Sequence, residues 1–338
     1  MHESADRYYP PIVHVALPAD EGRTLRDVLK LRLGISRKLY VRLKTSEDGL
    51  KINGQPARPH DKIAAGDKIE VRMAEETSED ILPQPMELDI VFEDEHLLVL
   101  NKPAGVIVHP TTGHYMNTLA NGVMHYWRER GERCRFRPVH RLDEHTSGLV
   151  IVAKHPYAHQ QLSEQMIEGT VEKEYLAFVY GKPPLEAGEV RGPIGRVPED
   201  PHRRAIRDDG APSLTYYALA RHFACGASEL AIRLGTGRTH QIRVHMTSIG
   251  CPLIGDGYYT DPAWERSALS RLLDGAAQRQ ALHARLLGFR HPVTKEAMTL
   301  EAALPRDLEA LAARLAELPE LPWPGSSQAS GENGGRHR

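Results

Sequence analysis

Long apolar runs are absent from the 338-residue chain, and none approaches the roughly 18 to 20 residues that a membrane span needs. Residues 1–11 are polar and lack the apolar stretch of a signal peptide. The three cysteines, Cys134, Cys225 and Cys251, lie far apart without a CxxC pairing, which argues against a disulfide framework and against a zinc knuckle. We therefore expect a soluble, cytoplasmic protein with reduced thiols.

A metal centre is not indicated either, although the chain contains 18 histidines. Neither His240 with His245 nor His140 with His145 has the i, i+4 spacing of a helical ligand pair, and no third ligand accompanies them. We expect no metal and no cofactor.

The chain also lacks the basic surplus that nucleic-acid binders usually carry, since its formal net charge is -2. The basic residues are concentrated locally, because residues 23–72 hold thirteen Lys and Arg against six Asp and Glu. Residues 74–101 reverse this balance, with nine acidic residues and neither Lys nor Arg. Such a charge switch is typical of a domain boundary.

The basic region predicts a small α/β module over residues 15–75. Apolar residues at helical spacing predict one helix at 24–33 and a second that Ser36 caps, and strands are expected at 50–53 and 68–73. Both helices have basic outer faces, and that of the second helix includes Arg37, Lys38 and Arg42. This face would suit RNA; the alternative is a solvated charged face on a minor domain. A flexible start, residues 1–14, would precede the module.

A linker over residues 76–86, broken by Pro83 and Pro85, would lead into a second domain over residues 87–320. Strands alternate irregularly with helices there, which predicts an α+β fold. The Pro, Gly, Ser and Asn content of residues 321–338 predicts a disordered tail. The expected strands are 88–92, 96–101, 148–154, 174–180, 214–220 and 229–234, and the expected helices are 117–130, 156–168 and 306–317.

Charged and polar residues crowd the segment from His140 to Gly148, directly before an apolar strand. Polar density at the entrance to a strand is typical of a functional site. Taken alone, Asp143 and Thr146 could equally cap a turn, which is the ordinary role of an isolated DxxT pattern.

The wider sequence favours the functional interpretation. The segment HRLDEHTSGLVIVAK and four further stretches, in the same order along the chain, resemble the RluA family of RNA pseudouridine synthases. The further stretches are LVLNKPAGVIVHP (98–110), KEYLAFVYG (173–181), TGRTHQIRVH (236–245), and GCPLIGD (250–256) followed by LHA (282–284). The resemblance implies a mixed, mostly antiparallel sheet with flanking helices and a central cleft.

The resemblance also implies roles for single residues. Asp143 would be the essential carboxylate, acting as nucleophile or as base, and Arg243 would favour its ionised form. Tyr175 would stack on the uracil and relay a proton, and Leu282 would form an apolar wall. Arg141 would fill the gap left by a flipped nucleotide. The alternatives are a helix-surface arginine for Arg243, core positions for Tyr175 and Leu282, and a salt bridge from Arg141 to Glu144.

Residues 15–75 in turn resemble the RNA-binding domain named for the fourth protein of the small ribosomal subunit. We therefore expect a monomeric enzyme whose partner is RNA, most plainly 23S ribosomal RNA or the precursor of the large subunit, with transfer RNA as the alternative substrate. A non-catalytic assembly factor that binds ribosomal RNA is a second alternative. Glycoside hydrolysis would need two carboxyls roughly 5 to 9 Å apart on separate segments, and no second acid is marked in the sequence.

Overall fold

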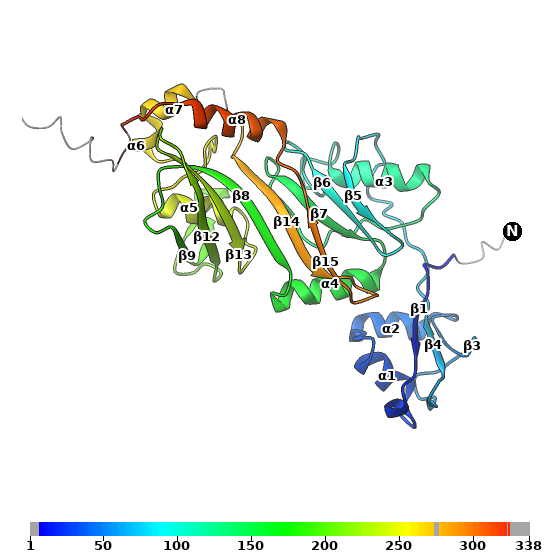
Figure 1. Ribbon diagram of the computed structural model, residues 1–338. Coiled ribbons are helices and arrows are strands. Elements are labelled where there is room, and N and C mark those ends of the chain that lie inside the picture. The colour runs from blue at the N-terminus through cyan, green and yellow to red at the C-terminus, as the bar shows by residue number, and fades with distance from the viewer. Residues whose placement is uncertain (1–6, 274–276, 323, 325–338) are drawn as a thin grey trace, which may run out of the picture.

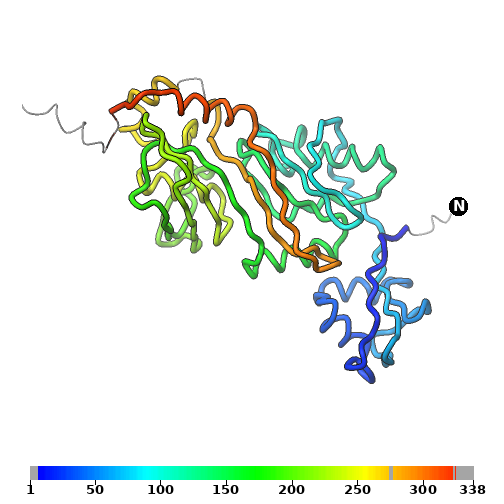
Figure 2. The backbone as a smooth tube through the Cα atoms, viewed as in Figure 1, coloured from blue at the N-terminus to red at the C-terminus, as the bar shows by residue number. Residues whose placement is uncertain are grey.

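The computed structural model describes residues 7–273, 277–322 and 324. A small module carries a four-stranded sheet, and a larger domain is organised around a nine-stranded sheet (Figure 1). The first described residues lie beside the small module, whereas the last helix crosses the opposite end of the large sheet (Figure 2). Within the described part of the chain, none of the helices is long and apolar enough to cross a membrane.

The small module has the strand order β1-β4-β2-β3, and its two helices pack on one face of that sheet. Thr24 and Ser36 cap the helices with side-chain oxygens. The cap at Ser36 was predicted, whereas Thr24 was expected to be the first residue of its helix. The elements are β1 (Ile12–Val15), η1 (Pro18–Asp20), α1 (Leu25–Leu31), α2 (Arg37–Thr45), β2 (Leu50–Ile52), β3 (Gln55–Pro56) and β4 (Lys68–Val71).

The expectation of a flexible start over residues 1–14 is wrong from residue 8 onward, since Tyr8 forms a β-bridge with Ala74 and Tyr9 is buried. β1 begins at Ile12 and pairs with β4 along its length, from Ile12 opposite Val71 to Val15 opposite Lys68. The buried Ile12 side chain anchors this strand in the core of the module. Residues 1–6 lie outside the described residues, as does most of the tail that was expected over residues 321–338.

The larger domain confirms the α+β fold class and the mostly antiparallel sheet. Its strand order is β5-β6-β7-β14-β8-β13-β12-β9, with β15 added to β14, and β7 with β14 is its one parallel pair among the described residues. The strands are β5 (Ile90–Glu93), β6 (Leu97–Lys102), β7 (Ser147–Ala153), β8 (Glu172–Tyr180), β9 (Ala187–Arg191), β12 (Leu214–His222), β13 (Ala227–Leu234), β14 (Leu282–Arg290) and β15 (Ala297–Glu301). A separate hairpin consists of β10 (Ile194–Val197) and β11 (Asp200–Ile206).

Helices cover both faces of the large sheet, which explains why β7 is an unbroken apolar run. Its residues Val150 and Val152 face the cluster that includes α3, and Leu149 and Ile151 face the cluster that includes α4. All seven residues of β7 are buried as a result. The helices are α3 (Leu119–Glu129), α4 (Pro156–Glu168), α5 (Gln241–Ser248), α6 (Pro262–Glu265), α7 (Ala268–Leu272) and α8 (Arg306–Glu317).

The small module is fixed to the larger domain through α4. Tyr157 donates a hydrogen bond from its hydroxyl to the carbonyl of Leu33 at 3.0 Å. Gln160 accepts from the backbone N–H of Ser36 at 3.0 Å and donates to the carbonyl of Gly34 at 2.6 Å. The loop between α1 and α2 therefore has a defined seat on α4, and the basic helix α2 lies beside the larger domain.

Candidate active site

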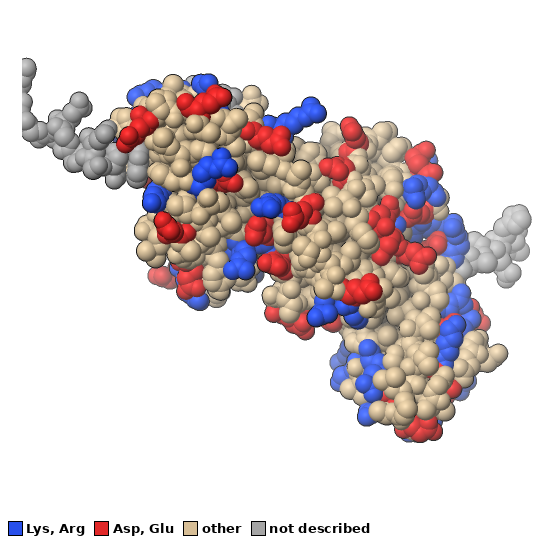
Figure 3. Space-filling view, in the orientation of Figure 1, with Lys and Arg blue, Asp and Glu red and all other residues tan. Residues whose placement is uncertain are grey.

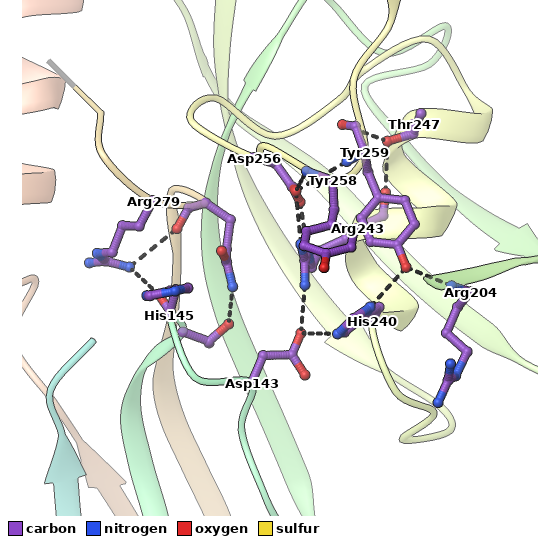
Figure 4. A network of polar contacts seen from close by, with 12 residues as sticks. Asp143, His145, Arg204, His240, Arg243, Thr247, Asp256, Tyr258, Tyr259 and Arg279 are labelled. Carbon is purple, nitrogen blue, oxygen red and sulfur yellow. Dashed lines mark hydrogen bonds and ion pairs between the residues drawn. The ribbon is translucent and has the colours of Figure 1, made fainter. Parts of the chain in front are cut away.

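Asp143 lies in the loop that enters β7, and its carboxylate points away from that loop toward α5 (Figure 4). The backbone N–H of Thr146 donates to the carbonyl of Asp143 at 3.1 Å, so the main chain closes the turn. The carboxylate is left for contacts with other elements. This arrangement argues against the turn-capping interpretation of Asp143 and Thr146.

Lys102, at the end of β6, binds the loop that carries Asp143. Its side chain is completely buried, and the ammonium donates to three carbonyls: Pro103 at 2.8 Å, Val106 at 2.7 Å and Glu144 at 2.9 Å. Burial, helped by the charge of Arg279, lowers the pKa of Lys102 to about 7, although Asp143 and Glu144 oppose the shift. Because an ammonium has three donors and no acceptor, three convergent carbonyls satisfy it fully.

Arg279 holds the other side of the loop. Its guanidinium donates to the carbonyl of His145 at 3.0 Å, to the carbonyl of Leu282 at 3.1 Å and to the hydroxyl of Ser147 at 3.2 Å. Asp307 on α8 neutralises it through an ion pair of 2.7 Å. The loop that carries Asp143 is thereby tied to the start of β14.

Gly148 is required where β7 and β14 run in parallel. Its φ is +117°, and a Cβ on it would lie 2.2 Å from the carbonyl oxygen of Ala284. That oxygen belongs to the backbone of β14 and cannot move aside as a flexible side chain would. The glycine of the TSG sequence thus allows the close strand contact that sets Asp143 beside β14.

Arg243 on α5 connects Asp143 to a second carboxylate. The guanidinium donates from Nε to Oδ2 of Asp256 at 2.6 Å and from Nη2 to Oδ1 at 2.8 Å. Its remaining nitrogen, Nη1, donates to Oδ2 of Asp143 at 3.4 Å. Burial disfavours the charged guanidinium, but the hydrogen bonds and charge of Asp256, together with the charge of Asp143, raise the pKa of Arg243. Arg243 is therefore a buried cation that faces the site.

His240 lies on the other side of the same carboxylate. Its Nε2 is 3.9 Å from Oδ2 of Asp143, and its Nδ1 is 2.8 Å from the hydroxyl of Tyr259. That hydroxyl also accepts the backbone N–H of Arg204 at 2.8 Å. Oδ2 of Asp143 is thus contacted from two sides, by an arginine and by a histidine (Figure 4).

Asp143 lies where two adjoining hollows meet. The smaller, of about 440 Å³, is lined by Tyr175 and Leu282 as well as by Asp143 and Arg243. Tyr175 in β8 lies opposite Ala284 of β14, so the strand pairing sets the tyrosine beside the segment that supplies Leu282. Burial, and after it the charge of Asp143, raises the pKa of Tyr175, which keeps the phenol protonated. The four residues expected at the catalytic centre therefore share one cavity.

The larger hollow, of about 1010 Å³, adjoins the first and includes Arg141. The side chain of Arg141 is exposed and lines both hollows. Among the described contacts, it forms no ion pair with Glu144, which was the alternative for this residue. The guanidinium therefore faces the open part of the cleft.

The three basic residues expected to bind RNA through the module lie elsewhere, on α2. Arg37 and Lys38 are exposed, and Arg42 forms an ion pair with Glu76, which also pairs with Arg137. Lys38 and Arg42 line a separate hollow of about 630 Å³ between α2 and α4. They do not join the Asp143 cavity.

Five residues of the site escaped the sequence analysis as functional candidates: Lys102, His240, Asp256, Tyr259 and Arg279. Lys102, His240 and Asp256 do stand within the family-like segments, so their position was a usable signal, whereas Tyr259 and Arg279 lie outside them. Residues 7–273 and 277–322 contain no group of three or more His, Cys, Asp or Glu side chains able to hold a metal ion.

The larger domain carries an open, polar cleft in which the carboxylate of Asp143 faces Arg243 and His240. Residues 96–248 match the family model described as RNA pseudouridylate synthase. A solved structure, that of human RNA pseudouridylate synthase domain containing 4, is 26% identical, covers 68% of this chain and 94% of its own, and superposes with a TM-score of 0.56.

Curated relatives extend the match over most of the chain. An uncharacterized RNA pseudouridine synthase of Bacillus subtilis, YhcT, is 36% identical over 86% of this chain and 93% of its own. The ribosomal large subunit pseudouridine synthase D of Xanthomonas campestris is 39% identical over 79% of this chain and 81% of its own, and that of Zymomonas mobilis 43% identical over 68% and 73%. The chain belongs to the RluA family of RNA pseudouridine synthases.

Proposed function

We propose that this enzyme converts specific uridines of large-subunit ribosomal RNA to pseudouridine, with Asp143 as the essential carboxylate. The observation that carries the proposal is the carboxylate of Asp143, which Arg243 contacts at 3.4 Å and which lies beside Tyr175 and Leu282 in a cavity open to solvent. Glycoside hydrolysis is disfavoured because Asp256, the other carboxylate that Arg243 contacts, is buried and engaged with both of its oxygens.

The reaction requires one bond to break and another to form at the same sugar carbon. The bond from C1′ to N1 breaks, the uracil turns, C5 bonds to C1′, the C5 proton leaves and N1 takes up a proton. Atoms and electrons balance without an oxidant or a cofactor. Asp143 would begin the sequence either by attacking or by removing a sugar proton, and both routes need an ionised carboxylate. The buried positive charge of Arg243 supports that state.

Tyr175 and Leu282 would hold the base in the smaller hollow. Both side chains are buried, and an aromatic ring with an aliphatic neighbour suits a flat pyrimidine and excludes water from the separated base. Because the Tyr175 phenol stays protonated, it would act as a relay that gives one proton as it accepts another.

Arg141 would occupy the space in the RNA stack that the flipped nucleotide leaves. Its exposed guanidinium stands at the boundary of both hollows, beside the position where a base would leave the RNA stack. Extracting a base costs a few kcal/mol, and a planar cation that stacks in the vacated space would recover part of that cost. Arg141 would thus favour the flipped state.

The small module would bind the RNA backbone, in keeping with its resemblance to the ribosomal-protein domain. The hollow between α2 and α4 brings Lys38 and Arg42 together with Arg135 and Arg137 of the segment that leads to Asp143. Glu76 neutralises only part of this charge, through its pairs with Arg42 and Arg137. Basic side chains also flank the module on the face shown in Figure 3, whereas acidic side chains predominate directly above it. Phosphate is the ligand that such a groove suits.

The choice of large-subunit ribosomal RNA rests on the names of the relatives. Two of those described above are called ribosomal large subunit pseudouridine synthase D. Both also match more of this chain than the central 96–248 segment: the Xanthomonas protein matches 79% of it and the Zymomonas protein 68%. Transfer RNA is the alternative substrate.

The test uses total RNA from cells that lack this protein, incubated with the purified wild-type chain or with Asp143→Asn. Carbodiimide labelling and mass spectrometry then locate every new pseudouridine. Sites that appear in large-subunit RNA with the wild type alone support the proposal. Sites in transfer RNA alone would replace the substrate. Binding of RNA without any new pseudouridine would instead support a non-catalytic assembly factor.

A further inference from the structure

We propose that His240 is a positioning residue that, together with Arg243, holds Oδ2 of Asp143 and leaves Oδ1 as the oxygen that acts on the uridine. The proposal rests on the proposed role of Asp143 as the essential carboxylate. Oδ2 has two cationic or proton-bearing neighbours, Arg243 Nη1 at 3.4 Å and His240 Nε2 at 3.9 Å. Both contacts are to the same oxygen, so they select one orientation of the carboxylate.

The backbone conformation of His240 is not one that the start of a helix requires. His240 is the residue before α5 and has φ 58° and ψ 18°, in the left-handed region that a side chain with a Cβ rarely adopts. Its side chain makes no capping hydrogen bond to α5. Gln241 holds the turn instead, by accepting from the backbone N–H of Arg238 at 3.0 Å and donating to the carbonyl of Leu214 at 2.9 Å.

The hydrogen bonds of Tyr259 favour one tautomer of His240. The Tyr259 hydroxyl accepts the backbone N–H of Arg204 at 2.8 Å, which leaves its own proton for Nδ1 of His240 at 2.8 Å. A neutral imidazole that accepts at Nδ1 carries its proton at Nε2. Nε2 is the nitrogen that faces Asp143, so the tautomer suits donation to Oδ2. The 3.9 Å separation is a preformed approach that would tighten when a nucleotide closes the site.

The charges around His240 favour the neutral imidazole. Burial is the main cause that lowers the pKa of His240, and the nearby cations Arg243 and Arg204 add to it. Asp143, and after it Asp256, oppose the shift. Tyr259 meets the ring edge-on, with the ring centroids 5.5 Å apart, and the ring of Tyr258 lies 6.5 Å away. Acidification would convert the neutral donor to a cation and bind the carboxylate more tightly.

The kinetic test compares His240→Asn, His240→Gly, Tyr259→Phe and the double variant His240→Asn with Tyr259→Phe. Asparagine and glycine both tolerate the left-handed backbone, so a loss that they share reports the missing imidazole. We expect kcat on the target RNA to fall about 10- to 100-fold in both His240 variants, with KM unchanged, because a misplaced reacting group costs about that much. Tyr259→Phe should lower kcat less, and the double variant should be no slower than His240→Asn alone. Full activity without the imidazole, or losses that multiply in the double variant, would overturn the proposal.

A second measurement does not depend on turnover. The imidazole of His240 is titrated by NMR in full-length, histidine-labelled protein, with His240→Asn used to assign its signals. Asp143→Asn should lower the pKa of His240 further, because the opposing charge is removed, and Tyr259→Phe should alter the tautomer signal. An unchanged titration in Asp143→Asn would refute the contact even if the enzyme is active. An inactive wild type with a responsive His240 would refute the proposed function and leave the pairing intact.

Discussion

Replacing His155 with asparagine should make the folded protein less sensitive to acid. His155 is fully buried and caps α4, since its Nδ1 accepts the backbone N–H of Ala158 at 3.2 Å. Its Nε2 meets Nδ1 of His96 at 3.0 Å. Burial, with a smaller effect of His96, lowers the pKa of His155 to about 3. The neutral imidazole is therefore the form that the folded chain requires.

The sign of the effect follows from proton uptake. The unfolded chain protonates His155 near the ordinary histidine pKa of about 6.5, whereas the folded chain does so only near 3. The stabilisation is therefore complete above about pH 6.5 and is lost as the pH falls toward 3. One such group lowers the free energy of unfolding by about 1.4 kcal/mol per pH unit within that window, or about 2 kcal/mol between pH 7 and pH 5.

The assay is urea unfolding of the wild type and of His155→Asn at several pH values between 5 and 7. Asparagine is a favoured N-cap and does not titrate, so the variant keeps the cap. The packing that the substitution removes lowers the free energy of unfolding by the same amount at every pH, so it does not change the slope. The slope of stability against pH should fall by one proton, and equal slopes in the two proteins would refute the reasoning. Because α4 seats the small module through Tyr157 and Gln160, we also expect acid to release the module.

Two further changes test the site and the groove. Asp256→Asn removes the counter-charge of Arg243, whose side chain is 7% exposed. The variant should reduce kcat and lower the free energy of unfolding, measured by urea denaturation, by about 3 to 5 kcal/mol. A loss of stability below about 1 kcal/mol would show that Asp256 does not hold Arg243. Arg135→Gln should weaken RNA binding and reduce the slope of log affinity against log salt concentration by about 0.7 to 0.9. Arg221→Gln on β12 is the control and should leave the slope unchanged. Equal slopes in the wild type and in Arg135→Gln would show that Arg135 does not contact the RNA.

Much of the fold could be predicted because its local signals agree with its packing. The capped helices of the module and the apolar strand β7 lie close to where periodicity and caps predict them. β14 was missed because Arg285, Gly288 and Arg290 interrupt its apolar pattern. Its strand character comes from pairing with β7, β8 and β15, which are distant in sequence. Such pairing leaves no local trace.

The residues of the site that were predicted all lie in motif segments, but other residues of the same segments were missed. The motifs led to Asp143, Tyr175 and Arg243, and these three share one cavity. Lys102 was passed over because lysine is ordinarily exposed, and only the folded chain brings three carbonyls around its ammonium. Arg279 was passed over because arginine is likewise ordinarily exposed and because no motif segment includes it.

The division of Arg243 between two carboxylates fits the proposed role of Asp143 as the catalytic carboxylate. A carboxylate held by both oxygens in a bidentate pair with arginine would have its lone pairs committed and would be a poor nucleophile or base. Here the bidentate geometry belongs to Asp256, which is buried and also accepts the backbone N–H of Tyr258 at 2.9 Å. Asp143 keeps one contact of 3.4 Å to the same cation, on one oxygen only. In the proposed mechanism, Asp143 would therefore gain the positive potential that an ionised carboxylate needs, while Oδ1, to which no described residue donates a hydrogen bond, would be available to react. Drawing Arg243 into a bidentate pair with Asp143 should abolish activity although every residue of the proposed site is still present.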